Sequence, residues 1–275
     1  GAIFLGEQTN LNRKVAIKLV RSNDPQITAR MQLEAESLAA VNHPAIVEVH
    51  DFIVSSGAEV GECYLVMGYV PGVDLARYLD DRPRRGLPTA EVLSLVTPIA
   101  SALVELHSRD IIHRDVKPSN MVRFQGADGV VRCKLVDFGF ARRRQDPNIT
   151  SDGIVVGTPA YLAREVIMGD GHSGASDVYA LGVTLFKLLS GQNPHGSSNV
   201  GEIVRNAVHH SVSLPATMLG TTLGELVERM LARNPDKRPD MLTVFKALNV
   251  AAAELTEHEE GDAPLVPPPA KEAAP

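Results

Sequence analysis

The stretch that decides the fold of this 275-residue chain is Ile111-Ile112-His113-Arg114-Asp115-Val116-Lys117-Pro118-Ser119-Asn120. It lies between two apolar segments, and Asp137-Phe138-Gly139 begins seventeen residues after Asn120. A tripeptide of this kind is easily met by chance, and a single aspartate more often caps a helix or lies in a turn. The ten-residue segment, with basic, acidic and amide side chains in a fixed order, is a far more specific signal.

These two segments resemble the catalytic loop H-R-D-x-K-x-x-N and the D-F-G metal motif of protein kinases, in the same order and at an ordinary spacing. Phosphoryl transfer needs oxygen ligands for Mg²⁺, a hard cation, and the resemblance assigns this part to Asn120 and Asp137. It assigns Asp115 to orient or accept the proton of the attacking hydroxyl, and Lys117 to neutralise charge on the transferred group. ATP and Mg²⁺ are therefore the expected cofactors.

Upstream, Val15-Ala16-Ile17-Lys18 matches the third-strand lysine motif of the same family. We expect Lys18 to hold the ATP phosphates and Glu34, in the following helix, to form an ion pair with Lys18. Glu36 competes for this part, but it lies on a different face of the helix, and the sequence from Glu34 to His43-Pro44 resembles the family pattern. Without the other motifs, a surface lysine and a solvated glutamate would be the usual interpretation.

The segment from Leu65 to Leu75 resembles the kinase hinge, with Met67 at the gatekeeper position. Gly68 stands where an acidic residue is usual, but backbone contacts do not depend on the side chain. Taken without the resemblance, these are ordinary core and turn positions. The resemblance implies backbone hydrogen bonds to adenine from Gly68 and Val70, packing on the adenine faces by Ala16 and Val122, and a ribose contact by Asp74.

The glycine loop that covers the ATP phosphates in this family, G-x-G-x-x-G-x-V, is represented only by Gly1-Ala2-Ile3. We therefore expect Gly1 and Ile3 at the nucleotide site. We also expect the chain to begin inside a domain, without the first strand and most of the loop. The missing backbone N–H groups predict weak ATP binding.

After the D-F-G element, the segment from Gly157 to Glu165 resembles the end of an activation segment and includes Thr158. Ala163-Arg164-Glu165 replaces the usual A-P-E, which changes the backbone restriction but not the charge. The resemblance implies a buried ion pair between Glu165 and Arg238, and it assigns Asp177 to steady the catalytic loop.

Arg114, directly before Asp115, implies a site for a phosphate group carried by the activation segment. Thr150 and Ser151 are the candidate acceptors of that phosphate. The run from Arg142 to Arg144 could join the site, although a solvated run of charge is the more usual role of such a cluster.

Composition narrows the class of protein. Hydrophobic residues make up 44% and charged residues 22% of the chain, as in globular proteins, and no apolar run approaches the length of a membrane span. The net charge of -6 lacks the basic excess of nucleic-acid-binding proteins, so no nucleic-acid partner is expected. Cys63 and Cys133 are too few for a disulfide framework or a four-cysteine zinc site, and reduced thiols indicate a cytoplasmic location.

The hydrophobic pattern predicts an α+β protein with two lobes. Residues 1–70 are typical of a small, sheet-rich lobe that lacks its first strand, and residues 71–253 of a larger helical lobe with a ligand cleft at the junction. Residues 254–275 are predicted to be a disordered acidic and proline-rich linker. Strands are predicted over 2–6, 14–20, 47–54 and 62–70, and helices over 25–41, 74–79, 89–107, 174–189, 200–208, 223–232 and 241–255. Pro98 either kinks the helix over 89–107 or shows that its start is misplaced.

Lys117 together with Gly157-Thr158-Pro159-Ala160-Tyr161 is typical of serine/threonine kinases, and the sequence looks most like the bacterial Hanks-type kinases. The leading hypothesis is an ATP- and Mg²⁺-dependent kinase that acts on serine and threonine residues of protein substrates. A non-catalytic, kinase-like binding or scaffold module is the first alternative, and a small-molecule phosphotransferase is the second. The enzyme is favoured because the lysine, the catalytic aspartate and both metal ligands are all present.

Overall fold

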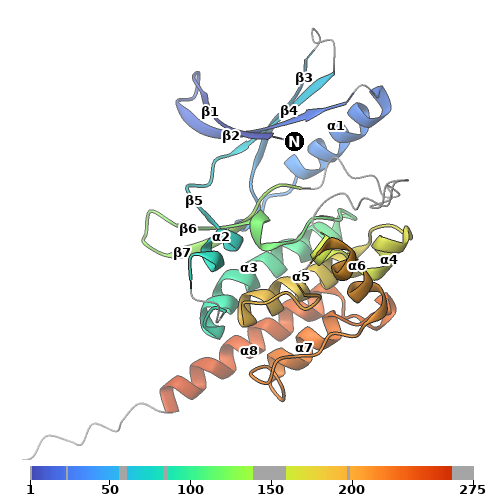
Figure 1. Cartoon of the computed structure of the whole chain (residues 1–275). Coiled ribbons are helices and arrows are strands. Elements are labelled where there is room, and N and C mark those ends of the chain that lie inside the picture. Colours follow the sequence, from blue (N-terminus) through green and yellow to red (C-terminus); the bar gives the residue numbers. More distant parts are fainter. Residues whose placement is uncertain are drawn as a thin grey trace, which may run out of the picture.

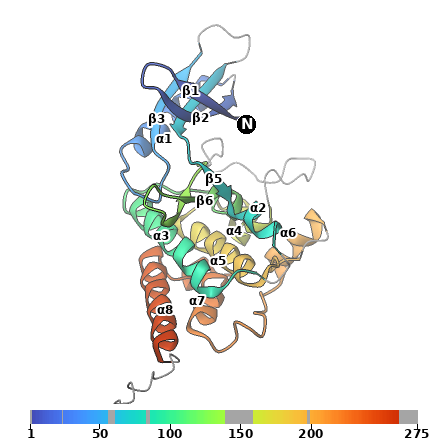
Figure 2. The ribbon, with the colours of Figure 1, turned by 90° about the vertical axis from the view of Figure 1, so that its left-hand side faces the viewer.

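The computed structural model describes residues 2–22, 24–55, 61–82, 86–138, 159–196 and 199–261. These residues form a small lobe built on a sheet and a larger lobe built mainly of helices, one above the other in Figure 1. The chain crosses from the small lobe to the large lobe between β4 and β5, which Figure 2 shows from the side. The α+β, two-lobed architecture expected from the sequence is confirmed.

The small lobe contains a four-stranded antiparallel sheet in the order β1-β2-β4-β3. β1 (Ala2–Gln8) and β2 (Arg13–Arg21), which correspond to the first two predicted strands, form an antiparallel hairpin, and β3 (Val49–Val54) and β4 (Glu62–Gly68) complete the sheet. Every second side chain of β4 is buried, because successive side chains of a strand point to opposite faces. One face of this sheet therefore belongs to the core of the lobe.

Helix α1 (Pro25–Ala39) packs beside this sheet, in contact with β3. Asp24 caps the helix by accepting a hydrogen bond from the backbone N–H of Gln26 at 2.9 Å. Pro25 occupies the first turn, where a helix has no partner for a backbone N–H. The helix buries a single face, which consists of Met31, Ala35 and Leu38.

The connection between the lobes requires glycine at position 72. β4 ends at Gly68, and β5 (Gly72–Asp74) begins four residues later. A β-carbon on Gly72 would lie 2.1 Å from the carbonyl oxygen of Arg123, far inside van der Waals contact. Glycine therefore allows β5 to lie close against β6 (Met121–Gln125).

The large lobe is built around two central helices, α3 (Thr89–Ser108) and α5 (Gly174–Ser190). Residues 176–186 of α5 are all buried, so this helix is surrounded by the rest of the lobe. The other helices of the described residues are α2 (Leu75–Asp80), α4 (Arg164–Met168), α6 (Val200–His209), α7 (Thr222–Met230) and α8 (Met241–Gly261), with short 3-10 turns η1 (Pro118–Asn120), η2 (Pro159–Tyr161) and η3 (Pro235–Lys237).

Helix α3 continues through Pro98, so its predicted start was correct. Within the described part of the chain, α3 is the one helix that is long and apolar enough to cross a membrane, judged by length and composition. Side chains such as Val96, Ile99 and Leu103 are fully buried in the core of the large lobe, and α3 contacts α5 and α8. In this structure α3 is therefore packed as a core helix.

The C-terminal helix is longer than the sequence pattern predicted. Helix α8 runs to Gly261, six residues past the predicted end at Leu255, and into the segment assigned to a linker from 254 onward. This segment is rich in glutamate, which has a good helix propensity, so the helix continues after its apolar pattern has ended. Residues 262–275 lie outside the described residues, and the disordered linker stays a prediction for them.

A second, three-stranded sheet was not predicted from the sequence. It consists of β5, β6 and β7 (Val131–Leu135), antiparallel and in that order. β6 begins directly after Asn120, and β7 ends two residues before Asp137. This hairpin therefore folds the chain so that the two predicted metal ligands lie close together.

Candidate active site

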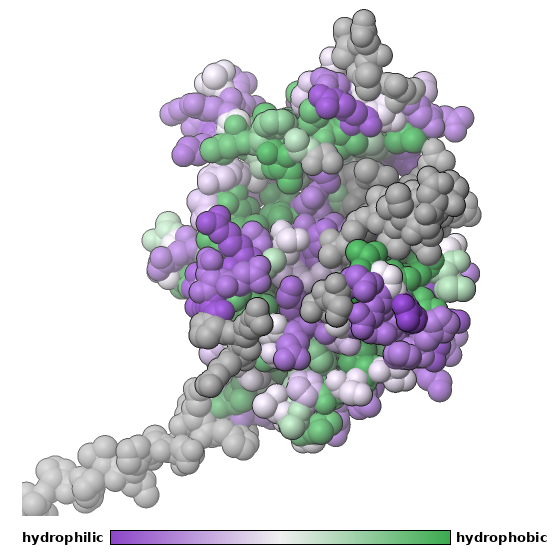
Figure 3. Space-filling view, in the orientation of Figure 1, coloured by the Kyte–Doolittle hydropathy of each residue, from purple (hydrophilic) through white to green (hydrophobic). Residues whose placement is uncertain are grey.

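A cavity of about 320 Å³ lies between the two lobes. β1, β2 and β4 contribute side chains from the small lobe, and β5 and β6 contribute side chains from the large lobe. Ile3, Phe4 and Leu5 of β1 line this cavity and are exposed. Apolar surface is visible on the small lobe in Figure 3. The cavity lining includes seven of the residues assigned to the nucleotide: Ile3, Ala16, Met67, Gly68, Val70, Asp74 and Val122.

The hinge side of this cavity is held in place by backbone hydrogen bonds. The N–H of Gly68 donates to the carbonyl oxygen of Glu48 at 2.9 Å, so this N–H already has a partner within the small lobe. The carbonyl of Val70 accepts from the N–H of Gly72 at 3.0 Å. Asp74 lines the cavity and also caps α2, where it accepts from a backbone N–H at 3.0 Å.

The catalytic loop brings Asp115, Lys117 and Asn120 together, as expected. The Nζ atom of Lys117 lies 2.8 Å from Oδ2 of Asp115. The amide Nδ2 of Asn120 donates to the same Oδ2 at 2.9 Å and to the carbonyl oxygen of Asp115 at 2.7 Å. These contacts fix the Asp115 carboxylate between a cation and an amide donor.

The oxygen atoms near Asn120 and Asp137 fit a hard cation. Asn120 uses its amide nitrogen on Asp115, which leaves its Oδ1 oxygen as an acceptor, and Asp137 adds a carboxylate. The Nδ2 atom of Asn120 lies 3.4 Å from the carbonyl oxygen of Asp137, so the two residues are neighbours. No group of three or more His, Cys, Asp or Glu side chains suited to a metal occurs in the described ranges. The Oδ1 atom of Asn120 and the carboxylate of Asp137 together suit Mg²⁺, which usually takes one or two protein ligands and completes its coordination shell with phosphates and water.

The expected ion pair between Lys18 and Glu34 is not formed, and this expectation is corrected. Lys18 instead contacts the carboxylate of Asp137, and it donates to the carbonyl oxygen of Phe138 at 3.2 Å. Glu34 lies 3.0 Å from the guanidinium of Arg114. The physical reason is that Lys18 and Glu34 each have an opposite charge of the large lobe within contact distance, Asp137 for Lys18 and Arg114 for Glu34.

Glu36, the competing candidate, accepts a hydrogen bond from Gln32 at 3.0 Å on the exposed side of α1. It has no part in the cluster around Lys18, as its position on another face of the helix suggested. The choice of Glu34 over Glu36 as the inward-facing glutamate of α1 is therefore supported by the geometry.

Asp177 anchors the catalytic loop from below, as the resemblance implied. It is buried, and its carboxylate accepts from the backbone N–H groups of His113 at 2.8 Å and Arg114 at 2.9 Å. Burial by itself would raise the pKa of Asp177, but hydrogen bonds from His107 and the backbone outweigh it, so the pKa lies below its usual range. The carboxylate therefore stays ionised and holds two consecutive backbone N–H groups of the loop.

Two histidines of this region were missed as functional residues. His107, in the last turn of α3, places its Nε2 atom 2.9 Å from Asp177. His113 is buried with its ring centroid 4.6 Å from that of Phe138, and burial lowers its pKa. The sequence indicated these two residues only by their positions. His107 lies at the end of the helix before the catalytic loop, and His113 is the first residue of the His-Arg-Asp motif in that loop.

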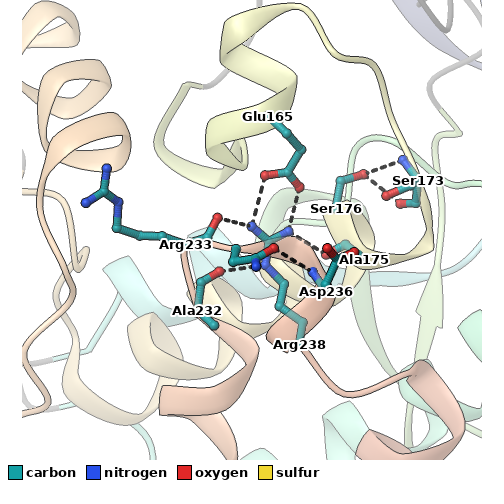
Figure 4. A network of polar contacts seen from close by, with 9 residues as sticks. Glu165, Ser173, Ala175, Ser176, Ala232, Arg233, Asp236 and Arg238 are labelled. Atoms are coloured by element: carbon teal, nitrogen blue, oxygen red, sulfur yellow. Dashed lines mark hydrogen bonds and ion pairs between the residues drawn. The ribbon is translucent and has the colours of Figure 1, made fainter.

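The predicted ion pair of the large lobe is present. Arg238 donates to both carboxylate oxygens of Glu165, at 2.5 and 2.9 Å, and its side chain is fully buried (Figure 4). Further hydrogen bonds run to the carbonyl oxygens of Ala175 at 2.9 Å and Ala232 at 2.8 Å. The guanidinium also lies 4.8 Å from the centre of the Tyr179 ring. The pair therefore ties α4 to the segment that precedes α8.

Several predicted site residues lie outside the residues that the structure describes: Gly1, Thr150, Ser151, Thr158 and the run Arg142 to Arg144. Their assigned roles in nucleotide binding and phosphorylation remain predictions. Lys18 does not line the inter-lobe cavity, but it contacts Asp137, which does.

Comparison with known sequences agrees with this geometry. A sequence model of the protein kinase domain matches residues 1–250 of the chain. The serine/threonine-protein kinase PknF of Mycobacterium tuberculosis is 35% identical over 248 residues, which cover 86% of this chain and 50% of PknF.

Two further relatives come from other bacteria. The serine/threonine-protein kinase PkaA of Streptomyces coelicolor is 35% identical over 248 residues, with 89% of this chain and 44% of PkaA covered. The serine/threonine-protein kinase pkn2 of Myxococcus xanthus is 35% identical over 254 residues, with 87% and 29% covered. The chain thus spans about half the length of these relatives or less.

Proposed function

The chain belongs to the protein kinase family, and from this premise we propose that it transfers the γ-phosphate of ATP, with Mg²⁺, to serine and threonine hydroxyls of protein substrates. The names of the bacterial relatives support the serine/threonine class. We further propose a cytoplasmic location, on the basis of the two free cysteines, and no nucleic-acid partner, on the basis of the net charge of -6.

One observation supports this proposal most strongly. Asp115, Asn120 and Asp137 lie close together beside the cavity between the lobes, and the β6–β7 hairpin brings the loop of Asp115 and Asn120 next to Asp137. A nucleotide with its base against Met67 would direct its phosphates toward Asp137, which lines the same cavity. In this proposal the base site, the metal site and the proton acceptor follow one another in the order that phosphoryl transfer requires.

Each residue has a distinct part in the proposed reaction. Asp115, held by Lys117 and Asn120, would accept the hydrogen bond of the substrate hydroxyl and orient it for attack. Lys117 would place its positive charge beside the transferred group, and Lys18 would hold the nucleotide phosphates. Mg²⁺ bound by Asn120 and Asp137 would neutralise charge on the phosphate oxygens.

The non-catalytic scaffold alternative is not favoured. All four polar residues that the chemistry needs are present in this chain: Lys18, Asp115, Asn120 and Asp137. The small-molecule phosphotransferase is also less well supported, because such an enzyme has no need for the activation-segment pattern that runs from Gly157 to Glu165.

The test is transfer of labelled phosphate from ATP to a generic protein substrate such as casein. Asp115→Asn and Asp137→Asn should each reduce transfer at least 100-fold, because they remove the proton acceptor and a metal ligand. Asp128→Asn, in the exposed turn between β6 and β7, is the matched control and should transfer phosphate at the unmodified rate. Transfer that survives Asp137→Asn, or that needs no divalent cation, would contradict the proposal.

A further inference from the structure

A second cavity, of about 240 Å³, lies in the large lobe between the start of α3, the loop before α7 and helix α8. α7 and α8 lie on the side of the large lobe that faces away from the small lobe (Figures 1 and 2), and this cavity shares no lining residue with the one between the lobes. Its lining includes the apolar side chains of Met218, Leu223, Ala251 and Leu255. Such a lining favours an apolar occupant, because binding removes apolar surface from water.

The walls of this cavity are held in place by hydrogen bonds. On one side, the hydroxyl of Thr221 donates to the carbonyl oxygen of Met218 at 2.9 Å and accepts from the N–H of Gly224 at 2.9 Å. A β-carbon on Gly224 would lie 1.8 Å from the same carbonyl oxygen, so the loop is closed tightly against α7. On the other side, the N–H of Leu87, just before α3, donates to the carbonyl oxygen of Leu188 in α5 at 2.7 Å. Because these walls are already ordered, an occupant does not bear the cost of ordering them.

We propose that Leu265 and Val266, which follow α8 in the sequence, occupy this cavity and dock the segment after Gly261 onto the large lobe. They are the only large apolar residues among residues 262–275. All other residues of that segment are alanine, proline or charged residues. The dipeptide is therefore the part of the predicted linker that gains most from leaving water.

The reach of the chain fits this assignment. Glu254 and Leu255 line the cavity, and Gly261 lies six residues after Leu255, about 9 Å further along the axis of α8. Leu265 follows four residues after Gly261, and four extended residues span up to about 14 Å. Glycine at a helix end is also the residue that most easily lets the chain reverse its direction. The dipeptide can therefore return to the cavity beside Leu255.

Prolines on both sides make Leu265-Val266 suited to docking. Pro264 precedes the dipeptide, and Pro267-Pro268-Pro269 follows it. A residue before proline is restricted to extended conformations, so Val266 has less conformational freedom to lose. Proline has no N–H, so within residues 264–269 only Leu265 and Val266 have an N–H that needs an acceptor. Three further threonines of the lining carry hydroxyl groups that can accept these hydrogen bonds: Thr89, Thr217 and Thr222.

Two other occupants are less well supported. A fatty acid or a phospholipid would bring an anionic head to a cavity whose lining includes Glu254, and two negative charges repel each other. A second copy of the chain would have to bind from solution. A segment tethered a few residues from the cavity acts instead at an effective concentration in the millimolar range.

The experiment is hydrogen–deuterium exchange of the 275-residue chain, followed by mass spectrometry of peptides from residues 217–224 and 248–256. In Leu265→Ser/Val266→Ser these peptides should exchange about threefold faster or more than in the unmodified chain, because a factor of this size needs less than the free energy of burying one such side chain. The matched control is Ala273→Ser/Ala274→Ser, which changes two residues of the same segment outside the dipeptide and should leave the exchange unchanged. Peptides of the small lobe should exchange alike in all three chains.

Leu255→Lys tests the cavity side of the contact, because Leu255 is partly buried and a lysine there places a charge in the apolar lining. In this background, Leu265→Ser/Val266→Ser should give no further increase in exchange, and an increase of the same size would overturn the proposal. Equal exchange in the unmodified chain and in Leu265→Ser/Val266→Ser would also overturn it. Protection that disappears on dilution would assign the cavity to a second copy, and a lipid retained by both chains in native mass spectrometry would assign it to that lipid. Either result would contradict docking of Leu265 and Val266.

Discussion

Replacing Glu165 by glutamine should destabilise the large lobe strongly. Arg238 is fully buried, and removing one partner of a buried ion pair costs about 3–5 kcal/mol. The lower end of this range applies here, because Arg238 keeps its hydrogen bonds to the carbonyl oxygens of Ala175 and Ala232, and glutamine retains one acceptor oxygen. A loss of about 3 kcal/mol corresponds to a fall of roughly 6–12 °C in the unfolding midpoint of a chain of this size.

Thermal unfolding followed by circular dichroism measures this change, with urea unfolding as a second measure. The control is Asp128→Asn, which breaks the exposed pair with Arg132 and should leave the midpoint unchanged within error. The double variant Glu165→Gln/Arg238→Met should lose less stability than the summed losses of the two single variants, because it contains no buried charge without a partner. A midpoint drop of less than 2 °C for Glu165→Gln would refute the reasoning, since it would mean that Arg238 does not depend on this carboxylate.

Two further predictions concern phosphorylation and pH. Incubation with ATP should place phosphate on Thr150 or Ser151, and the double variant Thr150→Ala/Ser151→Ala should transfer phosphate more slowly. An active enzyme in which mass spectrometry finds no phosphate on residues 140–160 would count against this prediction. Burial lowers the pKa of His195 from about 6.5 to about 4. Between these two pH values the unfolded chain binds a proton that the folded chain does not bind, so the free energy of unfolding falls as the pH drops from about 6.5 toward 4. His195→Gln should reduce the difference between the urea unfolding midpoints measured at pH 7 and pH 5. The control variant His210→Gln, at an exposed position, should leave this difference unchanged. The same pH difference in both variants would show that His195 does not titrate in this way.

The helices and strands with a clear hydrophobic period were predicted close to their observed positions. The hairpin of β1 and β2, the helix α1 and the central helix α5 carry patterns of their own, so local sequence is enough to identify them. The second sheet was missed because β5, β6 and β7 are short, with three to five residues each, and alternate only weakly. The end of α8 was missed because helix propensity, and not burial, carries it past Leu255.

The residues of the candidate site could be identified from the amino-acid sequence alone. Motifs with a fixed order of side chains identified Asp115, Lys117, Asn120 and Asp137, and the structure places them close together, with Asp137 lining the cavity between the lobes. The Glu165–Arg238 pair was also predictable, because two separate motifs each supplied one charge. In these cases the chemistry requires particular residue types at particular spacings, and such a pattern can be recognised in a single sequence.

The pairing of the charged side chains around Lys18 depends on the tertiary structure. Lys18, Glu34, Arg114 and Asp137 lie far apart in the sequence, and the motifs fit more than one pairing among them. The choice depends on how α1 lies against the catalytic loop, because differences of a few ångströms in a partly buried setting change which opposite charge is nearest. The position of a helix is set by packing across the whole lobe, and no local pattern of residues encodes it.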